Sequence, residues 1–371
     1  MSGADPALGV HLRAWCRARG HPFELAGTDT DSAFVVERAQ AETDRWHGAT
    51  RAGAGPGPES GPAARRPVAD RAEPAWGLAA RGALVEAGGP EPRFDLDERT
   101  AVWADAAPRL YAQAVAAQWD PATAVDWDAP FELPDEVEDA VVQVMTYLIE
   151  NEQAALVVPA RFLGRVHPHY REVVQLLAVQ VADEARHVEV FTRRAGLRRD
   201  TLGVSGAGGR ASLQTLLDEP DFTLATFLLS VLGEGTFLSL LSFLERHAPD
   251  PVTRQVARLA LQDEARHVAF GLAHVEQTVR DEPASLARLR LAVERRHASL
   301  ASTAGLNQGV FDALVVLAAG EWTAAAIARG YELVVALQAD MDDARRRRLV
   351  RIGFPADEAA SLSALHTRNF M

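Results

Sequence analysis

Two copies of one pentapeptide carry the residues whose types and spacing are best suited to chemistry. Residues 183–187 and 263–267 both read Asp-Glu-Ala-Arg-His, so each copy contains Glu-x-x-His. On a helix, side chains three residues apart lie on one face with their Cβ atoms about 5–6 Å apart. One carboxylate oxygen and one imidazole nitrogen can therefore reach the same metal ion. The sequence predicts one such pair at Glu184 and His187 and a second at Glu264 and His267.

Both pairs lie in apolar stripes with the helical period. The apolar residues in register with them are Leu177, Val181, Val188 and Phe191 in the first copy, and Val256, Ala260 and Gly271 in the second. This pattern predicts that both pairs point into a helical core, where a carboxylate or imidazole must be paired or coordinated to offset its desolvation. A single Glu-x-x-His is also typical of a solvated helix face, but two copies on apolar stripes favour metal binding.

A di-metal site in a helical bundle takes two further carboxylates, one from each of the other two core helices. Glu234 is the one ionisable residue in the apolar run 222–244. On the helix that precedes the first pair, Glu150 and Glu152 lie about 200° apart, so only one of them can face the core. The apolar stripe that aligns with Glu152 consists of Val141, Met145, Leu148 and Ala155. Glu152 is therefore preferred, with Glu150 as the alternative.

The predicted ligand set is Glu152, Glu184, His187, Glu234, Glu264 and His267. Its four carboxylates carry four negative charges, which two divalent ions would neutralise. Without metal, burial and mutual repulsion would raise the carboxyl pKa values and destabilise the core. Oxygen and nitrogen ligands without thiolate suit iron or manganese, whereas structural zinc more often recruits cysteine. We expect two iron ions, with manganese as the alternative.

The order of these six residues resembles that of the ferritin-like di-iron carboxylate oxygenases and oxidases. The extended form Asp-Glu-Ala-Arg-His is most similar to the α subunits of bacterial multicomponent monooxygenases, and the p-aminobenzoate N-oxygenases are more distant. The resemblance covers about residues 100–280. It implies that Asp183 and Asp263 hydrogen-bond to ligand histidines and that Arg186 and Arg266 hold these acids, which orients the imidazoles. Ordinary salt bridges on a helix surface are the alternative for these four residues.

Three positions depart from relatives in this family. Phe191 stands where ribonucleotide reductase small subunits carry a radical tyrosine, which disfavours a radical generator. Leu238 stands where bacterial monooxygenases commonly have a threonine, and Ala260 stands where p-aminobenzoate N-oxygenases add a histidine ligand. The resemblance therefore implies O₂-dependent oxidation but leaves hydroxylation, desaturation and N-oxygenation open.

Helical periodicity from about residue 100 onward predicts an all-α fold, and no strand-like alternation competes with it. We expect helices at about 100–118, 134–162, 168–197, 221–247, 251–280, 284–303, 309–339 and 357–366. The glycine-rich stretch 198–220 is expected to be a long crossover connection. The resemblance implies a ferritin-like four-helix bundle with additional flanking helices, in a domain at 76–371. Its metal-binding core would be 134–280 and its flanking helices 284–366.

The first 75 residues are expected to be a flexible or weakly structured N-terminal region. Residues 51–75 are rich in Pro, Gly and Ala without apolar periodicity, which is typical of a linker. Residues 9–19 and 33–46 are compatible with helices but offer little for an independent core.

Composition and charge exclude several classes of function. The chain has 371 residues, 38 basic residues that are all arginine, and 51 acidic residues, for a net charge of −13. This balance disfavours nucleic acid as a partner. The single cysteine, Cys16, cannot form an internal disulfide, and no signal-peptide pattern opens the chain, so a cytoplasmic location is expected. The run 222–244 is long enough to span a membrane, but Glu234 and its unbiased flanks favour a core helix instead.

Two further ionisable residues lie in apolar helical segments. Glu321 is expected to be a buried structural carboxylate or a pocket residue. His274, two turns after His267, is expected to be a hydrogen-bonded core histidine, with a place beside the metal ligands as the alternative.

We therefore expect a non-haem di-iron oxygenase or oxidase that activates O₂ and acts on a small organic substrate. The sequence shows no flavin, NAD or Fe–S motif, so electrons would come from a separate reductase or ferredoxin, and a homodimer is compatible with the chain. One alternative is a non-catalytic iron-handling or peroxide-scavenging ferritin-like protein, against which the length and the single cysteine argue. Manganese catalase is a second alternative that the ligands alone leave open.

Overall fold

The computed structural model describes residues 5–26, 33–38, 48–53, 68–300 and 308–366. The chain divides into two compact units. One comprises Met1–Asp97 together with His167–His169, and the other comprises Glu98–Val166 together with Tyr170–Met371. Most of the linker expected at 51–75, namely residues 54–67, lies outside the described residues.

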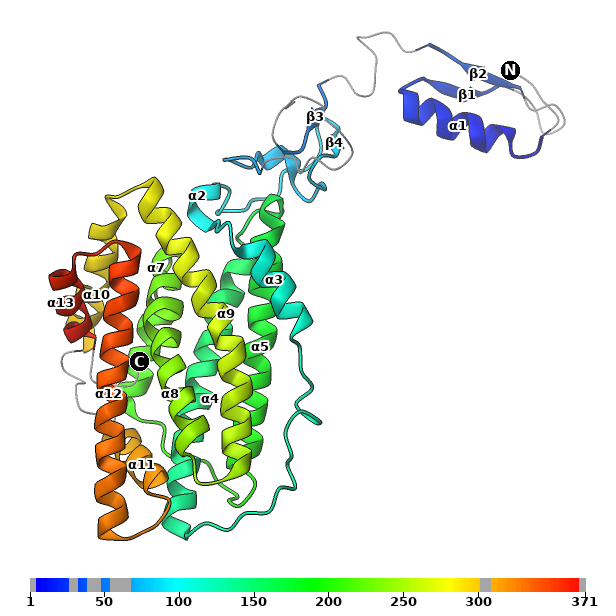
Figure 1. Ribbon diagram of the computed structural model, residues 1–371. Coiled ribbons are helices and arrows are strands. Elements are labelled where there is room, and N and C mark those ends of the chain that lie inside the picture. Colours follow the sequence, from blue (N-terminus) through cyan, green and yellow to red (C-terminus); the bar gives the residue numbers. More distant parts are fainter. Residues whose placement is uncertain (1–4, 27–32, 39–47, 54–67, 301–307, 367–371) are drawn as a thin grey trace. The chain divides into compact units, whose positions relative to one another are not determined.

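In its described residues, the first unit contains an α-helix, a short 3-10 helix (Pro74–Trp76) and two small two-stranded antiparallel sheets (Figure 1). Its elements are α1 (Leu8–Arg19), β1 (Phe23–Leu25) paired with β2 (Phe34–Val36), and β3 (Thr50–Arg51) paired with β4 (Leu84–Val85). The expectation of a helix-compatible stretch at 33–46 is wrong at its start, where the chain forms β2. The rings of Phe23 and Phe34 stack across this hairpin, with their centroids 5.7 Å apart, and Val35 and Val36 favour a strand because they are β-branched.

Residues 167–169 belong to the first unit because their backbone and side chains bond to it. The N–H of Ala69 donates to His169 Nε2 at 3.0 Å, and the N–H of His167 donates to the carbonyl of Leu96 at 3.0 Å. The compact part of this unit extends to Asp97, beyond the boundary expected at residue 75.

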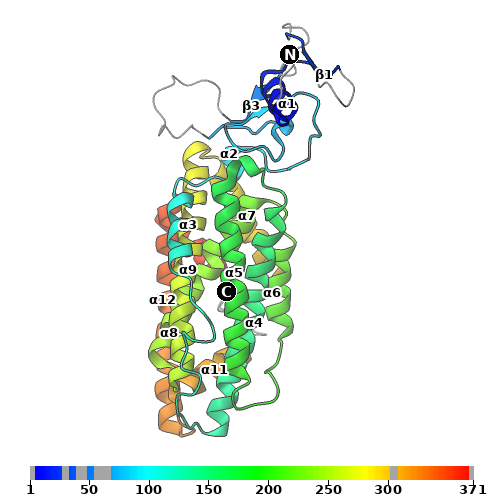
Figure 2. The same ribbon diagram turned by 90° about the vertical axis from the view of Figure 1, so that its right-hand side faces the viewer.

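The second unit is a helical bundle in which four long core helices run alongside one another (Figures 1 and 2). They are α4 (Asp135–Leu163), α5 (Arg171–Ala195), a third helix and α9 (Pro251–Asp281). The third helix joins α7 (Phe222–Thr226), a π-helical segment (Phe227–Glu234) and α8 (Gly235–His247). Helix α4 packs against α5, and α8 packs against α9. This arrangement is the all-α four-helix core that the sequence predicts.

The ends of the core helices follow local capping chemistry. The first turn of α4 carries Asp135, Glu136 and Glu138, whose negative charges are favourable at the positive end of the helix dipole. The Asp221 and Asp250 side chains accept backbone N–H groups in the first turns of α7 and α9, at 2.9 and 2.8 Å respectively. These breaks coincide with the boundaries expected from the sequence.

Seven further helices surround the core in the described residues. They are α2 (Arg99–Val102), α3 (Ala107–Ala116), α6 (Ala207–Leu217), α10 (Ser285–Leu300), α11 (Gln308–Ala319), α12 (Ala324–Ile352) and α13 (Ala356–Leu365). Helix α3 packs on α5 and α9, whereas α11 packs on α4 and α12, and α12 also packs on α8. The single helix expected at 100–118 is two helices, because Pro108 starts a new one.

Two other segments differ from the helices expected, because contacts between distant parts of the chain decide their structure. The connection at 198–220 contains α6, because Gly208 and Gly209 are buried where α6 approaches α4, and this packing compensates for their low helix propensity. The helix expected at 309–339 breaks after α11, where Gly320 takes a φ of +67° and Thr323 caps α12. Glu321 lies in this turn and is exposed, which corrects the expectation that it is buried.

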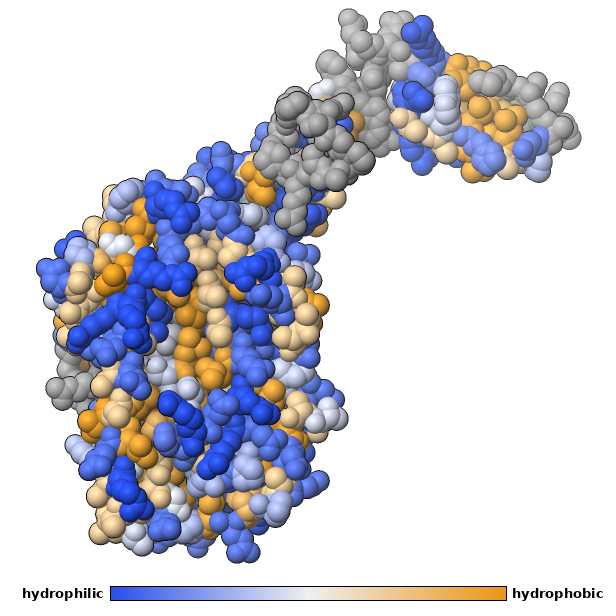
Figure 3. All heavy atoms as spheres, in the orientation of Figure 1, coloured by the Kyte–Doolittle hydropathy of each residue, from blue (hydrophilic) through white to orange (hydrophobic). Residues whose placement is uncertain are grey.

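The most apolar helical stretch of the described residues, Phe222–His247, is long enough to cross a membrane. In the structure, however, 78% of its most apolar part is buried by neighbouring helices. On the face of the helical unit that Figure 3 shows, hydrophilic side chains cover most of the surface and leave a narrow hydrophobic stripe. Phe222–His247 is therefore a core helix of the bundle, as the sequence predicts.

A buried charge network ties three helices together at one end of the core. The fully buried guanidinium of Arg194 on α5 bonds Glu138 Oε1 of α4 at 2.7 Å and Asp250 Oδ2 at the start of α9 at 2.8 Å. Its Nε also donates to Thr253 Oγ1 at 2.8 Å. The single guanidinium offsets part of the negative charge of the two carboxylates and links α4, α5 and the start of α9.

We predict that Arg194→Met destabilises the protein by about 3–5 kcal/mol, because it leaves Glu138 and Asp250 buried without a countercharge. Arg199→Met is the matched control, since the bridges of Arg199 to Asp135 and Asp139 lie at the surface. This control variant should change the free energy of unfolding by less than about 1 kcal/mol. Urea unfolding of both variants measures the difference, and equal losses would contradict the prediction.

His274 is a hydrogen-bonded core histidine, as expected. Its Nδ1–H donates to the carbonyl of Trp103 at 2.9 Å, and its Nε2 accepts the hydroxyl of Thr223 at 2.9 Å. Complete burial lowers the pKa of His274 to about 4, although the bond to Trp103 opposes this shift.

The lowered pKa of His274 predicts a loss of stability at acidic pH. Between pH 6.5 and about 4 the unfolded chain binds a proton at this residue and the folded chain does not, so the free energy of unfolding falls as the pH falls. The shift of about 2.5 pKa units gives a full effect of roughly 3–4 kcal/mol at about 1.4 kcal/mol per unit. His274→Gln should lose this pH dependence, which urea unfolding of the two metal-free proteins at pH 7.5 and pH 5 would measure. Parallel pH profiles would refute the prediction.

Candidate metal centre

The six side chains predicted as ligands come from the four core helices and meet in the middle of the bundle. Their positions are Glu152 on α4, Glu184 and His187 on α5, Glu234 at the end of the π segment, and Glu264 and His267 on α9. None of these residues is more than 4% exposed. Glu150, the alternative to Glu152, is half-buried and lines a different cavity, with Tyr147.

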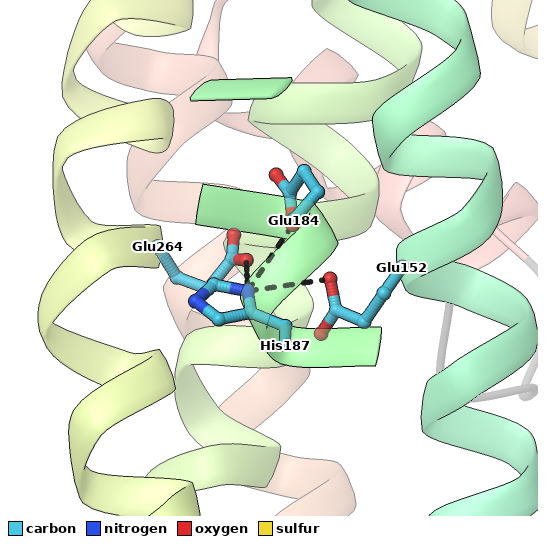
Figure 4. A group of neighbouring side chains, drawn as sticks. All are labelled: Glu152, Glu184, His187 and Glu264. Atoms are coloured by element: carbon cyan, nitrogen blue, oxygen red, sulfur yellow. Dashed lines mark hydrogen bonds and ion pairs between the residues drawn. The ribbon is translucent and has the colours of Figure 1, made fainter. Parts of the chain in front are cut away.

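The six residues form two overlapping groups, each able to surround one metal ion. Glu152, Glu184, His187 and Glu264 form the first group, in which one ligand atom from each residue lies within 4.8 Å of the others. Figure 4 shows these four side chains converging from α4, α5 and α9. The second group comprises Glu184, Glu234, Glu264 and His267 under the same limit. Glu184 and Glu264 belong to both groups, so they are placed to bridge two ions.

The histidine Nδ1 atoms face the carboxylates. His187 Nδ1 lies 3.2 Å from Glu184 Oε2, 3.3 Å from Glu264 Oε1 and 3.6 Å from Glu152 Oε2. His267 Nδ1 lies 3.0 Å from Glu184 Oε1 but without hydrogen-bond geometry. Each imidazole therefore points a nitrogen toward the interior of the cluster.

Several of the converging atoms are buried and have no hydrogen-bond partner. Such atoms show whether the cluster is suited to a metal ion. They are Glu152 Oε1, Glu184 Oε1, Glu234 Oε2, both carboxylate oxygens of Glu264, and His267 Nδ1. Buried polar atoms are nearly always bonded, so six such atoms in one place need a common partner. Oxygen and nitrogen donors at these separations suit divalent iron or manganese. The residues present fit two metal ions.

In the protein without metal, the pKa values of three carboxylates of the cluster are strongly shifted. Burial, followed by repulsion from Glu184 and Glu264, raises the pKa of both Glu152 and Glu234 well above the usual glutamate value. Burial also acts to raise the pKa of Glu184, but the charge of His267 and the hydrogen bond from His187 outweigh it and lower that pKa. Divalent cations would replace protons as the compensating charge.

Each histidine is held from behind by the aspartate of the other motif. His187 Nε2 lies 3.2 Å from Asp263 Oδ2, and His267 Nε2 lies 3.2 Å from Asp183 Oδ2. An aspartate that accepts the Nε2 proton leaves Nδ1 as the free donor for a metal. The two copies of the motif are therefore joined by two crossed contacts, because the aspartate of each helix holds the histidine of the other.

The two arginines of the repeat hold these aspartates. Arg186 bonds Asp183 on its own helix and lies 3.2 Å from Asp263, while Arg266 bonds Asp263 and lies 3.7 Å from Asp183. Hydrogen bonds from His187 and Trp119 and the charge of Arg266 lower the pKa of Asp263 to about 2, against the effect of burial.

Two residues that the sequence gave no reason to select complete this arrangement. Trp119 Nε1 donates to Asp263 Oδ2 at 2.8 Å, and its ring lies parallel to that of His187 with centroids 6.5 Å apart. Gln118 Nε2 donates to Asp183 Oδ1 at 3.0 Å. Both residues follow α3 in an irregular segment, where no periodicity connects them with the motifs.

The π segment decides how the third helix presents Glu234. An additional residue in one turn shifts the helix register, a feature frequent at functional sites. As a result Phe237 and Leu240 are buried, while Leu238, four residues after Glu234, is only half-buried. Gln180 of α5 donates to Glu234 Oε1 at 3.2 Å, and Arg348 of α12 donates to the carbonyl of Val231 at 2.9 Å within the segment.

An apolar cavity adjoins the carboxylates on the side of α4 and the π segment. It holds about 20 Å³ of space for solvent, enough for about one water molecule, and Glu152, Glu234 and Glu264 are among its lining residues. The remaining lining residues are Asn151, Ala155, Leu213, Leu216, Leu229, Gly233, Phe237 and Arg296. From the third helix, Leu229, Gly233, Glu234 and Phe237 line this space, whereas Phe227, Val231 and Leu238 do not.

No family model matches the chain, and no curated protein sequence matches it. In structure the chain is similar to R2-like ligand-binding oxidase with an aerobically reconstituted Mn/Fe cofactor, at 20% identity and a TM-score of 0.50, over 67% of this chain and 93% of that chain. It is also similar to a point mutant of R2-like ligand-binding oxidase with an anaerobically reconstituted Mn/Fe cofactor, at 19% identity and a TM-score of 0.50, over 66% and 92%. These similarities establish the fold as a ferritin-like helical bundle with flanking helices, as the sequence predicts.

The crossed contacts predict which substitutions are energetically coupled. Asp263→Asn should weaken metal binding about 10–100-fold, because Asp263 orients a histidine that faces the cluster. Since Asp263 contacts His187 of α5 directly, its coupling energy with His187→Ala should exceed its coupling energy with His267→Ala, to which it connects only through Asp183 and the arginines. Anaerobic titration with Fe²⁺ measures these couplings. A larger coupling of Asp263 to His267 would show that the contacts are not crossed.

Proposed function

We propose that this protein is a non-haem di-metal oxidoreductase that uses O₂ to oxidise a small organic substrate. The observation that carries the proposal is the pair of overlapping four-residue groups that share Glu184 and Glu264. The ferritin-like fold supports it, since the similar R2-like ligand-binding oxidases contain Mn/Fe cofactors. Hydroxylation, desaturation and N-oxygenation are the candidate reactions.

Glu152 and His187 would hold one ion, Glu234 and His267 the other, and Glu184 and Glu264 would bridge them. We propose two iron ions, with manganese as an alternative at either position. When bound, two redox-active ions at about 3.5–4 Å can together supply the electrons that reduce O₂. Recurrent turnover then draws electrons from a separate donor, for which we propose a cytoplasmic ferredoxin or reductase.

The residues of the chain prepare this chemistry in three ways. Asp183 and Asp263 retain the Nε2 protons of the two histidines, so that Nδ1 faces the ions. Glu184 and Glu264 lie between the two groups and keep the ions close together. The apolar side chains beside the carboxylates, with Leu216, Leu229 and Phe237 among them, exclude bulk water from the site.

Anaerobic loading with Fe²⁺ tests the proposal. We expect about two ions per chain and a visible absorption that develops only when O₂ is added. Glu152→Gln should lose about one ion, whereas Glu150→Gln, two residues away and outside the cluster, should retain both. Full stoichiometry in Glu152→Gln would contradict the site assignment.

Two further measurements, of peroxide disproportionation and of iron accumulation, distinguish the alternative functions. A catalase would disproportionate hydrogen peroxide steadily when loaded with manganese, without reductant or organic substrate. An iron-handling protein would oxidise and accumulate iron beyond two ions per chain. Either result would contradict the proposed oxidation of an organic substrate.

A further inference from the structure

Arg348 of α12 lies against the third helix at the end of the π segment. Its side chain is buried, and its Nε donates to the carbonyl of Val231 at 2.9 Å. Val231 lies inside the π segment, three residues before Glu234. The arginine therefore bonds the backbone of the same turn that carries this carboxylate.

Gly235, the residue after Glu234, lets the guanidinium come this close. A Cβ atom on Gly235 would lie 2.5 Å from Arg348 Nε and 2.6 Å from its Cζ, so an alanine here would push the guanidinium away from Val231. The φ of Gly235 is −57°, an ordinary helical value that any residue adopts. Glycine is unfavourable inside a helix relative to alanine, and the close contact with Arg348 offsets this disadvantage.

Side-chain donors bond two consecutive carbonyls of the π segment. An additional residue in a turn displaces N–H groups from the carbonyls that they would meet in an α-helix. The carbonyl of Val231 accepts Arg348 Nε. The carbonyl of Leu232 accepts the Thr236 hydroxyl at 2.7 Å, and Arg345, one turn before Arg348, donates to Thr236 Oγ1 at 3.4 Å. Two arginines of α12 are thus connected to this stretch of backbone.

The charge of Arg348 is not used in an ion pair. No acidic side chain of the described residues pairs with Arg348, whereas the buried Arg194 faces Glu138 and Asp250. Burial and the charges of two neighbouring arginines lower the pKa of Arg348 to about 10, so its guanidinium is still charged at neutral pH. Its Nη2 is buried without a hydrogen-bond partner. A buried charge in this state adds little to stability, so the contribution of Arg348 lies in the geometry that its bond imposes.

We propose that Arg348 is a positioning residue of the metal centre, which holds the third helix in its π register and thereby directs Glu234 to the ion beside His267. One residue of register turns a side chain by about 100° around a helix axis, so loss of the π register would turn Glu234 away from the cluster. The two bridging carboxylates come from α5 and α9, and the loss should therefore fall mainly on the ion that Glu234 and His267 share. The inference rests on the metal centre of the proposed function but not on its reaction with O₂.

Anaerobic calorimetric titration with Fe²⁺ tests the proposal without turnover. Arg348→Leu removes the donor, and it should weaken one ion by about tenfold or more while the other stays within roughly threefold, as for residues that orient a ligand. Arg348→Lys retains a charged donor and should recover part of the affinity. Arg347→Gln is the matched control, because Arg347 is the neighbouring arginine and is exposed. This control variant should bind both ions as the wild type does.

Gly235→Ala displaces the guanidinium without removing it. It should weaken the same ion as Arg348→Leu, and it should have little further effect in an Arg348→Leu background, where no guanidinium remains to be displaced. Arg348→Leu should also be coupled more strongly to Glu234→Gln than to Glu152→Gln, because Arg348 acts through Glu234. A loss of folding stability alone would produce neither pattern. Urea unfolding of the metal-free variants identifies those that fold, and if Arg348→Leu does not fold, Gly235→Ala and Arg348→Lys carry the test.

Two results would overturn the proposal. One is a folded Arg348→Leu or Gly235→Ala variant that binds both ions as tightly as the wild type, and the other is stronger coupling of Arg348 to Glu152 than to Glu234. Failure of the proposed function is a different result. If the loaded protein did not consume O₂ but Arg348→Leu still weakened one ion, the inference would stand and the oxidase proposal would fall. If O₂ were consumed and these variants bound both ions unchanged, only the inference would fall.

Discussion

The burial of four carboxylates among the core helices is the constraint on which the rest of the structure depends. Carboxylates in a low-dielectric interior repel one another and lose their hydration, so they need compensating positive charge. The Arg194 network meets the same requirement with an arginine from the chain. At the centre of the bundle the chain supplies only His187 and His267 within the cluster, and several oxygens are left without partners. Two divalent metal ions would complete the charge balance of the core.

The crossed contacts couple the geometry of the metal-binding residues to the packing of α5 against α9. Asp263 of α9 holds His187 of α5, and Asp183 of α5 holds His267 of α9, so each ligand geometry depends on the relative position of both helices. Trp119, from outside the core, adds a bond to Asp263. A shift of one helix would therefore disturb both ion positions at once.

Flanking helices complete the surroundings of the cluster. Leu213 and Leu216 of α6 and Arg296 of α10 line the small cavity beside Glu152, Glu234 and Glu264. Arg296 donates to Ser212 Oγ of α6, which ties the two flanking helices together. The core helices thus supply the carboxylates and imidazoles, and the flanking helices enclose them.

Local sequence was sufficient to predict the core helices and the clustering of the six carboxylate and imidazole residues, because both follow from helical periodicity. The choice of Glu152 over Glu150 needed only the angle between two positions on one helix. The repeated Asp-Glu-Ala-Arg-His also placed Asp183, Arg186, Asp263 and Arg266 next to the cluster. These inferences succeed because side chains three or four residues apart share a face whatever surrounds the helix.

The remaining features depend on contacts between residues far apart in the chain, which periodicity does not encode. Packing on α4 makes α6 a helix despite its glycines, the turn at Gly320 separates α11 from α12, and the π segment turns Leu229 and Phe237 into the cavity. Glu321 was expected to be buried by its apolar neighbours but lies exposed in that turn. The sequence by itself determined which side chains could bind metal. Only the tertiary structure decided which aspartate holds which histidine and that Arg348 lies against the π segment, because both depend on how separate helices pack together.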